Sequence, residues 1–378
     1  SEGTISEFRG NGNTIDTIRF VRQAGRFAGS NTVTGLLYFS KESAISGSPE
    51  NMIQHAVFSS DGVIGGNNQF EQLSLGTGFR YWLQADSLTQ PGSYHTFAHV
   101  QTINQLEVSG DCSRGVSILT STYKPIQAVI DYTGGPLTTE YLQVEDIRNT
   151  GQVLEVQNGI DAGNNEGFQF TGPLQPRTLY WVNGQGEWDD VNHWSQISGG
   201  TGGECPPTRL DDVFFDSGSG FTQQEDSVMV NIPHIHCNDM TWVDGFVNHV
   251  KFVSCDTVTG AFYVDTLHQW VNETRFLSID TCSLHLTGSI ELDPQLIFQY
   301  FGDVHFESEM DTGYETIDLE WEGNRYNLLN KAYFNGRGGK WKVKEGSKFL
   351  NLDDTVYFRM GELLVVEDTL RLFNFTSV

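Results

Sequence analysis

"GRFAGSNTVTGL" at residues 25–36 aligns without gaps on "GVIGGNNQFEQL" at residues 62–73, and this internal repeat decides the predicted fold. Both segments have the form G-x-Φ-x-G-[SN]-N-x-Φ-x-x-L, where Φ is an apolar residue. Gly and Asn tolerate positive φ, so we expect them to form the same corner in both copies while the apolar positions point inward. Repeated corners joined by short strands are typical of a solenoid.

Short strand-like runs continue through the rest of the chain. Runs such as "GVSILTST", "IQAVIDYT" and "AFYVDT" alternate apolar and polar residues, and Gly, Asp or Asn separates them. Helix-length amphipathic segments are missing between the runs, which argues against βαβ units. The strands are very short and few two-residue hairpin turns join them, which favours a parallel β-helix over stacked sandwiches. We therefore predict an all-β protein made of parallel β-helix (β-solenoid) segments, whose coils stack at about 4.8 Å.

A polar stretch with two prolines, "NEGFQFTGPLQPRTLYW" at residues 165–181, marks a boundary. The chain has 378 residues, which is more than one compact core usually holds. We predict a first β-solenoid at residues 1–172, a small irregular Trp-rich connecting module at 173–222, and a second β-solenoid at 223–378. The strand-like pattern runs to the last residues, so we expect the second solenoid to continue in a longer parent protein.

The charge of the chain limits its partners. Asp and Glu number 48 against 22 Lys and Arg, which gives a formal net charge of −26. Such a surface repels phosphate backbones and anionic lipid, so we expect no nucleic-acid partner and no docking to a membrane surface. No apolar run is long enough to span a bilayer. The same charge would attract Ca²⁺, the one cofactor that we consider.

The stretch "YWVNGQGEWDDVNHWS" at residues 180–195 contains Trp181, Trp188 and Trp194 beside His193. A carbohydrate-binding module would need these indoles to be coplanar and exposed to solvent. The alternative is that they pack a small core, with His193 hydrogen-bonded inside it. We favour this structural core, because large aromatic residues dominate the cores of modules with few aliphatic residues.

Two groups of oxygen-bearing side chains are candidate Ca²⁺ ligands. The loop "DAGNNEG" at residues 161–167 offers Asp161, Asn164, Asn165 and Glu166, without the spacing of an EF-hand. The second group consists of the aspartates Asp189, Asp190, Asp211, Asp212 and Asp216. The alternative, which we favour for both groups, is that Asp and Asn cap turns through the local backbone.

Signals for other chemistry are weak. His234 and His236 would lie on one face of a strand, as metal ligands can, but no second pair has matching spacing, and we favour a structural role. The sequence contains no GxSxG, HExxH, P-loop or dinucleotide-binding fingerprint. The enzyme alternative is a polysaccharide lyase or glycosidase, in which paired carboxylates would line a groove of a parallel β-helix.

Four segments in a fixed order resemble a recurrent block of very large Bacteroidota surface proteins that the type IX secretion system exports, among them gliding-motility and adhesion filaments. They are "NGIDAGNNEGFQFT" (158–171), the Trp-rich stretch, "SGGTGGECPPTRLDDVFFDSGSG" (198–220) and "HCNDMTW" (236–242). The family's motifs read D-x-G-N-N-x-G-W-x-F, Y-W-x-G-x-G-x-W-x-D-x-x-H-W, C-x-P-T-x-x-D-x-V-x-F-D and C-x-D-M-x-W. Here Phe168 stands where Trp is common, and Asn183 replaces a usual Gly.

This resemblance implies a non-enzymatic, extracellular structural or adhesive scaffold, a segment of a large cell-surface filament or adhesin. The implied partners are adjacent solenoid repeats of the same chain or other copies, the type IX secretion machinery and surface glycans. The carbohydrate-binding module and the polysaccharide lyase or glycosidase remain the alternatives.

The resemblance also bears on the cysteines and on glycosylation. The block carries Cys at both positions matched by Cys205 and Cys237, so we expect a disulfide between them, and Cys255 and Cys282 are a second candidate pair. Asp, then Thr or Ser, then an aliphatic residue resembles the O-glycosylation signal of exported Bacteroidota proteins, although Asp-Thr could also simply open a strand. The candidate acceptors are Thr17, Ser87, Ser227, Thr257, Thr266, Thr355 and Thr369.

Overall fold

The computed structural model divides into two compact units, Ser1–Leu174 (unit 1) and Gln175–Val378 (unit 2). The described residues are 5–85, 99–122, 125–222, 226–232, 234–243, 250–253, 261–269, 275–278, 283–292, 297–300, 302–308, 313–318, 328–336, 339–344, 350–359, 361–365 and 375–377. Across these residues the regular structure is β-strand, apart from two single-turn 3₁₀ helices, η1 (Val191–His193) and η2 (Ser217–Ser219). The expected all-β class is therefore confirmed.

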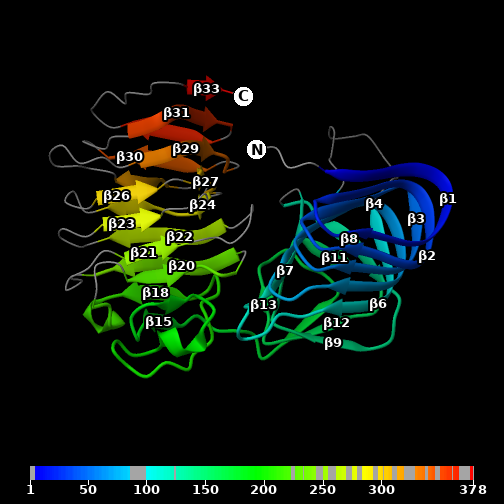
Figure 1. Cartoon of the computed structure of the whole chain (residues 1–378), viewed down its shortest axis with the longest axis horizontal. Coiled ribbons are helices and arrows are strands. Elements are labelled where there is room, and N and C mark those ends of the chain that lie inside the picture. Colours follow the sequence, from blue (N-terminus) through cyan, green and yellow to red (C-terminus); the bar gives the residue numbers. More distant parts are fainter. Residues whose placement is uncertain are drawn as a thin grey trace. The chain divides into compact units, whose positions relative to one another are not determined.

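Unit 1 is built from fourteen described strands, and every strand pair among them is parallel. The strands are β1 (Ser6–Phe20), β2 (Gly25–Phe39), β3 (Ser43–Phe58), β4 (Gly62–Leu75), β5 (Arg80–Leu83), β6 (Val100–Val108), β7 (Ser117–Ser121), β8 (Ala128–Tyr132), β9 (Leu137–Glu140), β10 (Leu142–Glu145), β11 (Ile147–Asn149), β12 (Leu154–Gln157), β13 (Ile160–Asp161) and β14 (Phe168–Thr171). β1 to β4 pair in sequence order (Figure 1). β4 then divides between β5 and β6.

The two repeat copies found in the sequence, in β2 and β4, do not pair with each other. β3 lies between them and pairs with both, and β1 pairs with the outer side of β2. The pairing of β3 with β4 shifts register between Gly47 and Asn51. The corner of β3 differs in length from those of β2 and β4. A gapless alignment of the sequence therefore did not detect the copy of the repeat in β3.

The core of unit 1 contains stacks of like residues from successive strands. Phe20, Phe39 and Phe58 end β1, β2 and β3, and their rings stack with centroids 5.1 and 4.7 Å apart. Parallel strands in register bring equivalent side chains together, and aromatic pairs at this separation add about 1 kcal/mol beyond their burial. The repeat thus stabilises the fold through contacts that recur in each strand.

Corner glycines and asparagines have separate roles. Gly29 and Gly66 have positive φ, as expected. Asn31 and Asn68 do not, and both side chains are buried. The Asn68 amide donates to the Gly65 carbonyl oxygen at 2.9 Å and to Gln101 Oε1 at 2.7 Å. The asparagine therefore satisfies polar groups inside the unit and does not adopt the positive φ of the corner.

Unit 2 has one sheet of nineteen described strands, and all of its pairs are parallel except β15 with β17. The strands are β15 (Thr178–Trp181), β16 (Gly186–Glu187), β17 (Trp194–Ser195), β18 (Asp212–Phe215), β19 (Ser227–Met229), β20 (His234–Trp242), β21 (Val250–Val253), β22 (Ala261–Gln269), β23 (Arg275–Ser278), β24 (Ser283–Leu286), β25 (Ile290–Leu292), β26 (Ile297–Tyr300), β27 (Val304–Phe306), β28 (Glu315–Asp318), β29 (Leu328–Phe334), β30 (Lys340–Val343), β31 (Leu350–Phe358), β32 (Glu362–Val365) and β33 (Phe375–Ser377).

The order of pairing in unit 2 is regular. β18 to β22 each pair with the strand two places further on, and β23 to β25 pair with β26 to β28, three places further on. In Figure 1 the labelled strands follow one another from β15 to β33. No helix among the described residues is long and apolar enough to cross a membrane.

The Trp-rich segment belongs to unit 2 and is not a separate connecting module. β15 pairs in parallel with β18, and β18 pairs with β20. Its tryptophans share one hydrophobic cluster with core residues of later strands, among them Phe306 and Trp341. The boundary between the units lies at Leu174/Gln175, close to the expected end of the first segment, and the segment after it starts the second sheet.

Candidate functional site

The three tryptophans of the opening of unit 2 are buried, with exposed fractions of 0% for Trp181, 1% for Trp188 and 0% for Trp194. The rings are not coplanar. Trp194 meets Trp181 edge-on at 90° and Trp188 at 70°, with centroids 5.1 and 4.7 Å apart. Since a sugar platform requires exposed, parallel ring faces, this cluster has the geometry of a core.

Hydrogen bonds from Trp181, Trp194 and His193 help to hold the same cluster together. Trp181 Nε1 donates to the Gly184 carbonyl oxygen and Trp194 Nε1 to the Trp188 carbonyl oxygen, both at 2.7 Å. His193 stacks on Trp181, with ring centroids 4.7 Å apart, and its Nδ1 lies 2.8 Å from the Val182 carbonyl oxygen. A carbonyl only accepts, so Nδ1 carries a proton in this contact. The hydrogen-bonded His193 expected within the core is present.

Backbone geometry explains the residues that flank these rings. Asn183 and Gly184 both have positive φ, 66° and 72°. Asn is the non-glycine residue that best tolerates this region, which accounts for Asn183 at a position where the resembling proteins usually have Gly. A Cβ added to Gly186 would lie 1.9 Å from His193 Nε2, so this glycine provides the space that the imidazole fills.

A buried ion pair fixes the loop that follows the cluster. Asp211 is 1% exposed and binds the Arg177 guanidinium in bidentate fashion, through Nε at 2.9 Å and Nη2 at 2.8 Å. Thr208 donates its backbone N–H and its hydroxyl to the same carboxylate, at 2.7 and 2.9 Å. The T-x-x-D part of the block therefore closes a loop, and Arg177 compensates the buried charge.

The other four aspartates of this group also accept hydrogen bonds from protein donors. Asp190 caps η1 by accepting from the Asn192 N–H at 2.9 Å, and Asp216 caps η2 by accepting from the Gly218 N–H at 2.8 Å. Asp189 and Asp212 accept from the side-chain amides of Asn231 and Asn238. These contacts are those of turn capping and of links between neighbouring segments.

The loop "DAGNNEG" has a similar network. Asp161 Oδ1 accepts from the Gly163 N–H at 3.1 Å and from Asn165 Nδ2 at 2.7 Å. Asn164 donates its amide to the Pro125 carbonyl oxygen and to Asp146, and Asn165 Oδ1 accepts from the Ile147 N–H. Glu166 is exposed. The side chains of Asp161, Asn164 and Asn165, which were proposed as Ca²⁺ ligands, thus form hydrogen bonds that hold the loop in place.

The expected disulfide between Cys205 and Cys237 is wrong. Cys112 and Cys205 each take part in a disulfide, whereas Cys237 is a free thiol, 4% exposed, in the hydrophobic cluster of unit 2. Burial raises the thiol pKa of Cys237 well above its usual range, and nearby carboxylates, Asp239 first, raise it further. On β20 the side chain of Cys237 points inward, like that of Ile235, and contributes to packing. Cys255 and Cys282 lie outside the described residues.

Two further groups of predicted site residues, the histidines of β20 and the candidate glycosylation acceptors, lie partly within the described residues. His234 is buried and His236 half-buried on β20, with ring centroids 6.4 Å apart. Of the candidate glycosylation acceptors, Thr17 is exposed, whereas Ser227 is buried in β19. Asp226 precedes β19, as a strand-opening residue would, but Asp16 lies inside β1. Ser87, Thr257 and Thr369 lie outside the described residues, as do the side chains of Thr266 and Thr355.

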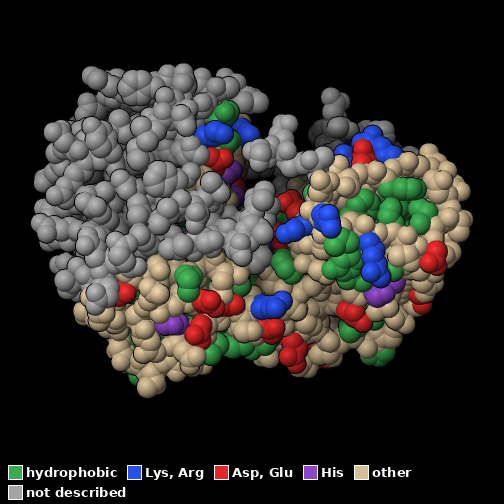
Figure 2. Space-filling model, in the orientation of Figure 1, with side chains coloured by type: hydrophobic (Ala, Val, Ile, Leu, Met, Phe, Trp, Pro, Cys, Tyr) green, Lys and Arg blue, Asp and Glu red, His purple; other side chains and the backbone are tan. Residues whose placement is uncertain are grey.

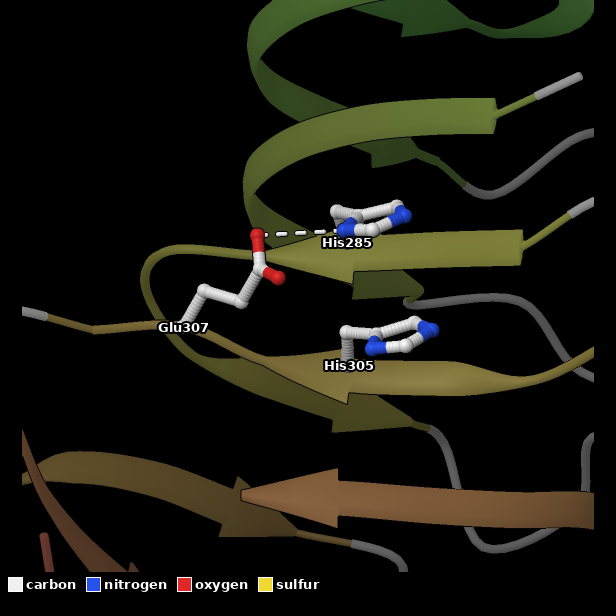
Figure 3. A group of neighbouring side chains, drawn as sticks. All are labelled: His285, His305 and Glu307. Carbon is white, nitrogen blue, oxygen red and sulfur yellow. Dashed lines mark ion pairs between the residues drawn. The ribbon is translucent and has the colours of Figure 1, made fainter. Parts of the chain in front are cut away.

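A cluster that the sequence analysis did not find joins β24 and β27. His285 and His305 are direct partners in the parallel pairing, and Glu307 follows His305 by two positions. Their ligand atoms lie within 4.8 Å of one another. His285 Nδ1 is 3.0 Å from Glu307 Oε2, and Figure 3 shows this carboxylate directed at the His285 ring. The signal in the sequence was the recurrence of Φ-H-Φ in "LHL" and "VHF", which only the register makes visible.

The two imidazoles belong to a longer stack of rings on one face of unit 2. His305 lies between His285 and Tyr333, with centroids at 4.4 and 4.7 Å, and Tyr357 continues the stack at 4.7 Å. Burial, together with the nearby His285 and Arg359, lowers the pKa of His305 to about 4. Each inner ring covers the face of the next, so the stack offers ring edges, and not faces, to a ligand.

Acidic side chains are dispersed over the face of the described surface that Figure 2 presents, and are not collected in one patch. Comparison with protein-family models, with curated proteins and with solved structures finds no match.

Proposed function

We propose that both units are β-solenoids and that the chain is a segment of an extracellular, non-enzymatic scaffold, part of a surface filament or adhesin. The observation that carries the proposal is the stacking of equivalent residues from successive parallel strands, as in Phe20, Phe39 and Phe58. Phe306, Phe334 and Phe358 repeat the pattern in unit 2. Each such repeat contacts its neighbours and extends one continuous core, which suits a rod that bears load.

Three further properties support this assignment. The net charge of −26 keeps such a surface soluble and disfavours phosphate-bearing partners. Disulfide-bonded Cys112 and Cys205 fit an oxidising compartment, as an exported protein would meet. The segments that resemble the type IX-exported surface proteins have structural contacts, since the tryptophans form a core and the aspartates cap turns.

The same contacts favour a scaffold over the two alternatives. The carbohydrate-binding hypothesis relied on Trp181, Trp188 and Trp194, whose faces are covered by the core. The lyase or glycosidase hypothesis needs carboxylates that are free to act on a substrate. Asp211, the most buried aspartate of this segment, instead binds Arg177 and Thr208. Adjacent repeats of the parent protein are the partners that such a rod would meet first, and surface glycans or the secretion machinery would be met through other surfaces.

Immunogold electron microscopy of intact producing cells tests the location, with antibodies raised against this chain. We expect label on the outer surface, along filaments or a surface layer. Label that appears only after the cells are opened would contradict the proposal. The purified chain is then incubated with a panel of acidic and neutral polysaccharides, and we expect no release of reducing ends or unsaturated products. Cleavage of any member would establish the enzyme alternative instead.

A further inference from the structure

The chemistry of the cluster on β24 and β27 is that of a transition-metal site. Two imidazoles and one carboxylate make the His₂Glu set that binds zinc through three protein ligands and leaves a coordination position open. Nitrogen donors select zinc and its neighbours over calcium, which prefers oxygen ligands alone. The donor atoms of His285, His305 and Glu307 are already gathered within 4.8 Å of one another.

The fold, and not a flexible loop, positions the three residues. His285 and His305 are paired in register. Glu307 lies one residue past the end of β27, and its N–H donates to the Leu286 carbonyl oxygen at 2.7 Å, so the extended backbone continues and Glu307 projects on the same side as His305. His285 Nε2 also lies 2.9 Å from Ser283 Oγ. A hydrogen bond from the second ring nitrogen of a ligating histidine orients the first, so Ser283 directs Nδ1 of His285 towards the carboxylate.

We propose that His285, His305 and Glu307 bind one Zn²⁺ ion, which links the neighbouring strands β24 and β27. The two rings stand 3° from parallel with centroids 4.4 Å apart, whereas ligands of a tetrahedral zinc are separated by about 3.4 Å at a Zn–N distance of about 2.1 Å. Both rings therefore turn towards each other about χ2 when the ion binds. This torsion is broad for histidine, and the rotation of His305 gives up the contact of its Nδ1 with Asn335 Nδ2, which is 3.0 Å long.

Binding stabilises unit 2, because the ion would bind the folded site and not the separated ligands of the unfolded chain. The site is half-buried, which leaves room for a water molecule or an external ligand at the open position. This inference concerns a metal site and stands independently of the scaffold proposal, since a surface scaffold and an unrelated protein could equally carry it.

Isothermal titration of the full chain with ZnCl₂, after removal of metals with EDTA and dialysis, tests the site. We expect one equivalent of Zn²⁺ to bind, with an affinity that falls by at least about tenfold in His305→Phe. Phenylalanine keeps an aromatic ring between His285 and Tyr333 but supplies no ligand atom. Glu307→Gln is the second variant, because it removes the charge of a half-exposed side chain without disturbing the stack.

His55→Gln is the matched control, since His55 bonds to Ser74 in unit 1 and lies outside the cluster. Circular dichroism establishes that each variant is folded, and Co²⁺ spectra report whether the ligands change. Loss of the strong site in both cluster variants, with the control unchanged, supports the proposal. Absence of zinc binding by the native chain, or equal affinity in all four proteins, overturns it.

Discussion

The side-chain amide of Asn51 donates to Oδ1 of Asn68 at 2.9 Å, across the paired strands β3 and β4, where neither residue is exposed. The chain of buried amides extends in both directions, since Asn51 Oδ1 accepts from the Asn31 N–H and Asn68 donates to Gln101. Each repeat thus contributes one polar side chain that is satisfied by its neighbours. Removing one member leaves its buried partners without a hydrogen bond, which costs stability.

Replacing Asn68 by Ala should destabilise unit 1 by about 3 kcal/mol, because the substitution leaves buried groups of Asn51, Gly65 and Gln101 without their partner. Urea unfolding followed by circular dichroism measures the change, and hydrogen exchange of peptides from β3 and β4 locates it. Asn104→Ala is the control, since its hydrogen bond to Glu71 is at the surface, and it should cost less than about 0.5 kcal/mol. Equal effects of the two substitutions would refute a structural role for the buried amides.

The sequence predicted the all-β class and two copies of the repeat because those copies have corners of equal length. The intervening strand β3 was missed, since its register shifts between Gly47 and Asn51 and a gapless alignment cannot follow it. Composition alone was enough to predict burial of the tryptophans. Their assignment to a separate module failed, because the pairings of Leu179 with Val213 and of Val213 with Met240 join residues about thirty positions apart.

The cysteines and the histidines also show that contacts between residues far apart in the sequence could not be predicted. Cys237 matched a cysteine position of the resembling block, but a match in sequence does not say whether the side chain points into the core or towards another cysteine. His285 and His305 come together only through the pairing of β24 with β27. Residues brought together by register leave little local signal, so site prediction from this sequence was weakest where strands meet.

Trp181→Ala should destabilise unit 2 by about 4 kcal/mol, because it opens a large cavity beside Trp194 and His193. Trp82→Ala is the matched control, since Trp82 is half-buried and packs beside Arg80, and it should cost about 1 kcal/mol. Chemical unfolding of both variants gives the comparison. A Trp181→Ala protein of native stability that had lost binding to a glycan would favour the carbohydrate-binding alternative.

Gly186→Ala should destabilise unit 2 by roughly 2 kcal/mol, since the added methyl group would overlap the His193 ring that stacks on Trp181. The ring cannot turn aside without breaking its contact with the Val182 carbonyl oxygen. Gly135→Ala is the control, because a Cβ there meets no atom within 4 Å and its φ is not in the left-handed region. The midpoints of thermal unfolding are compared, and similar midpoints would show that the space beside His193 is not limiting.

Cys237 should resist alkylation in the folded protein, even at a pH where an exposed thiol reacts readily. At pH 8.5 an unperturbed thiol, with a pKa of about 8.5, is half ionised. The raised pKa of Cys237 keeps its thiol protonated at this pH, and the core excludes the reagent. A short pulse of iodoacetamide at pH 8.5, followed by peptide mapping, measures the modification. The same pulse in urea without reductant should label Cys237 fully, because unfolding exposes it and lowers its pKa. If Cys237 stayed unlabelled in urea and appeared in a peptide linked to Cys205, the free thiol would be disproved and the disulfide implied by the resemblance restored.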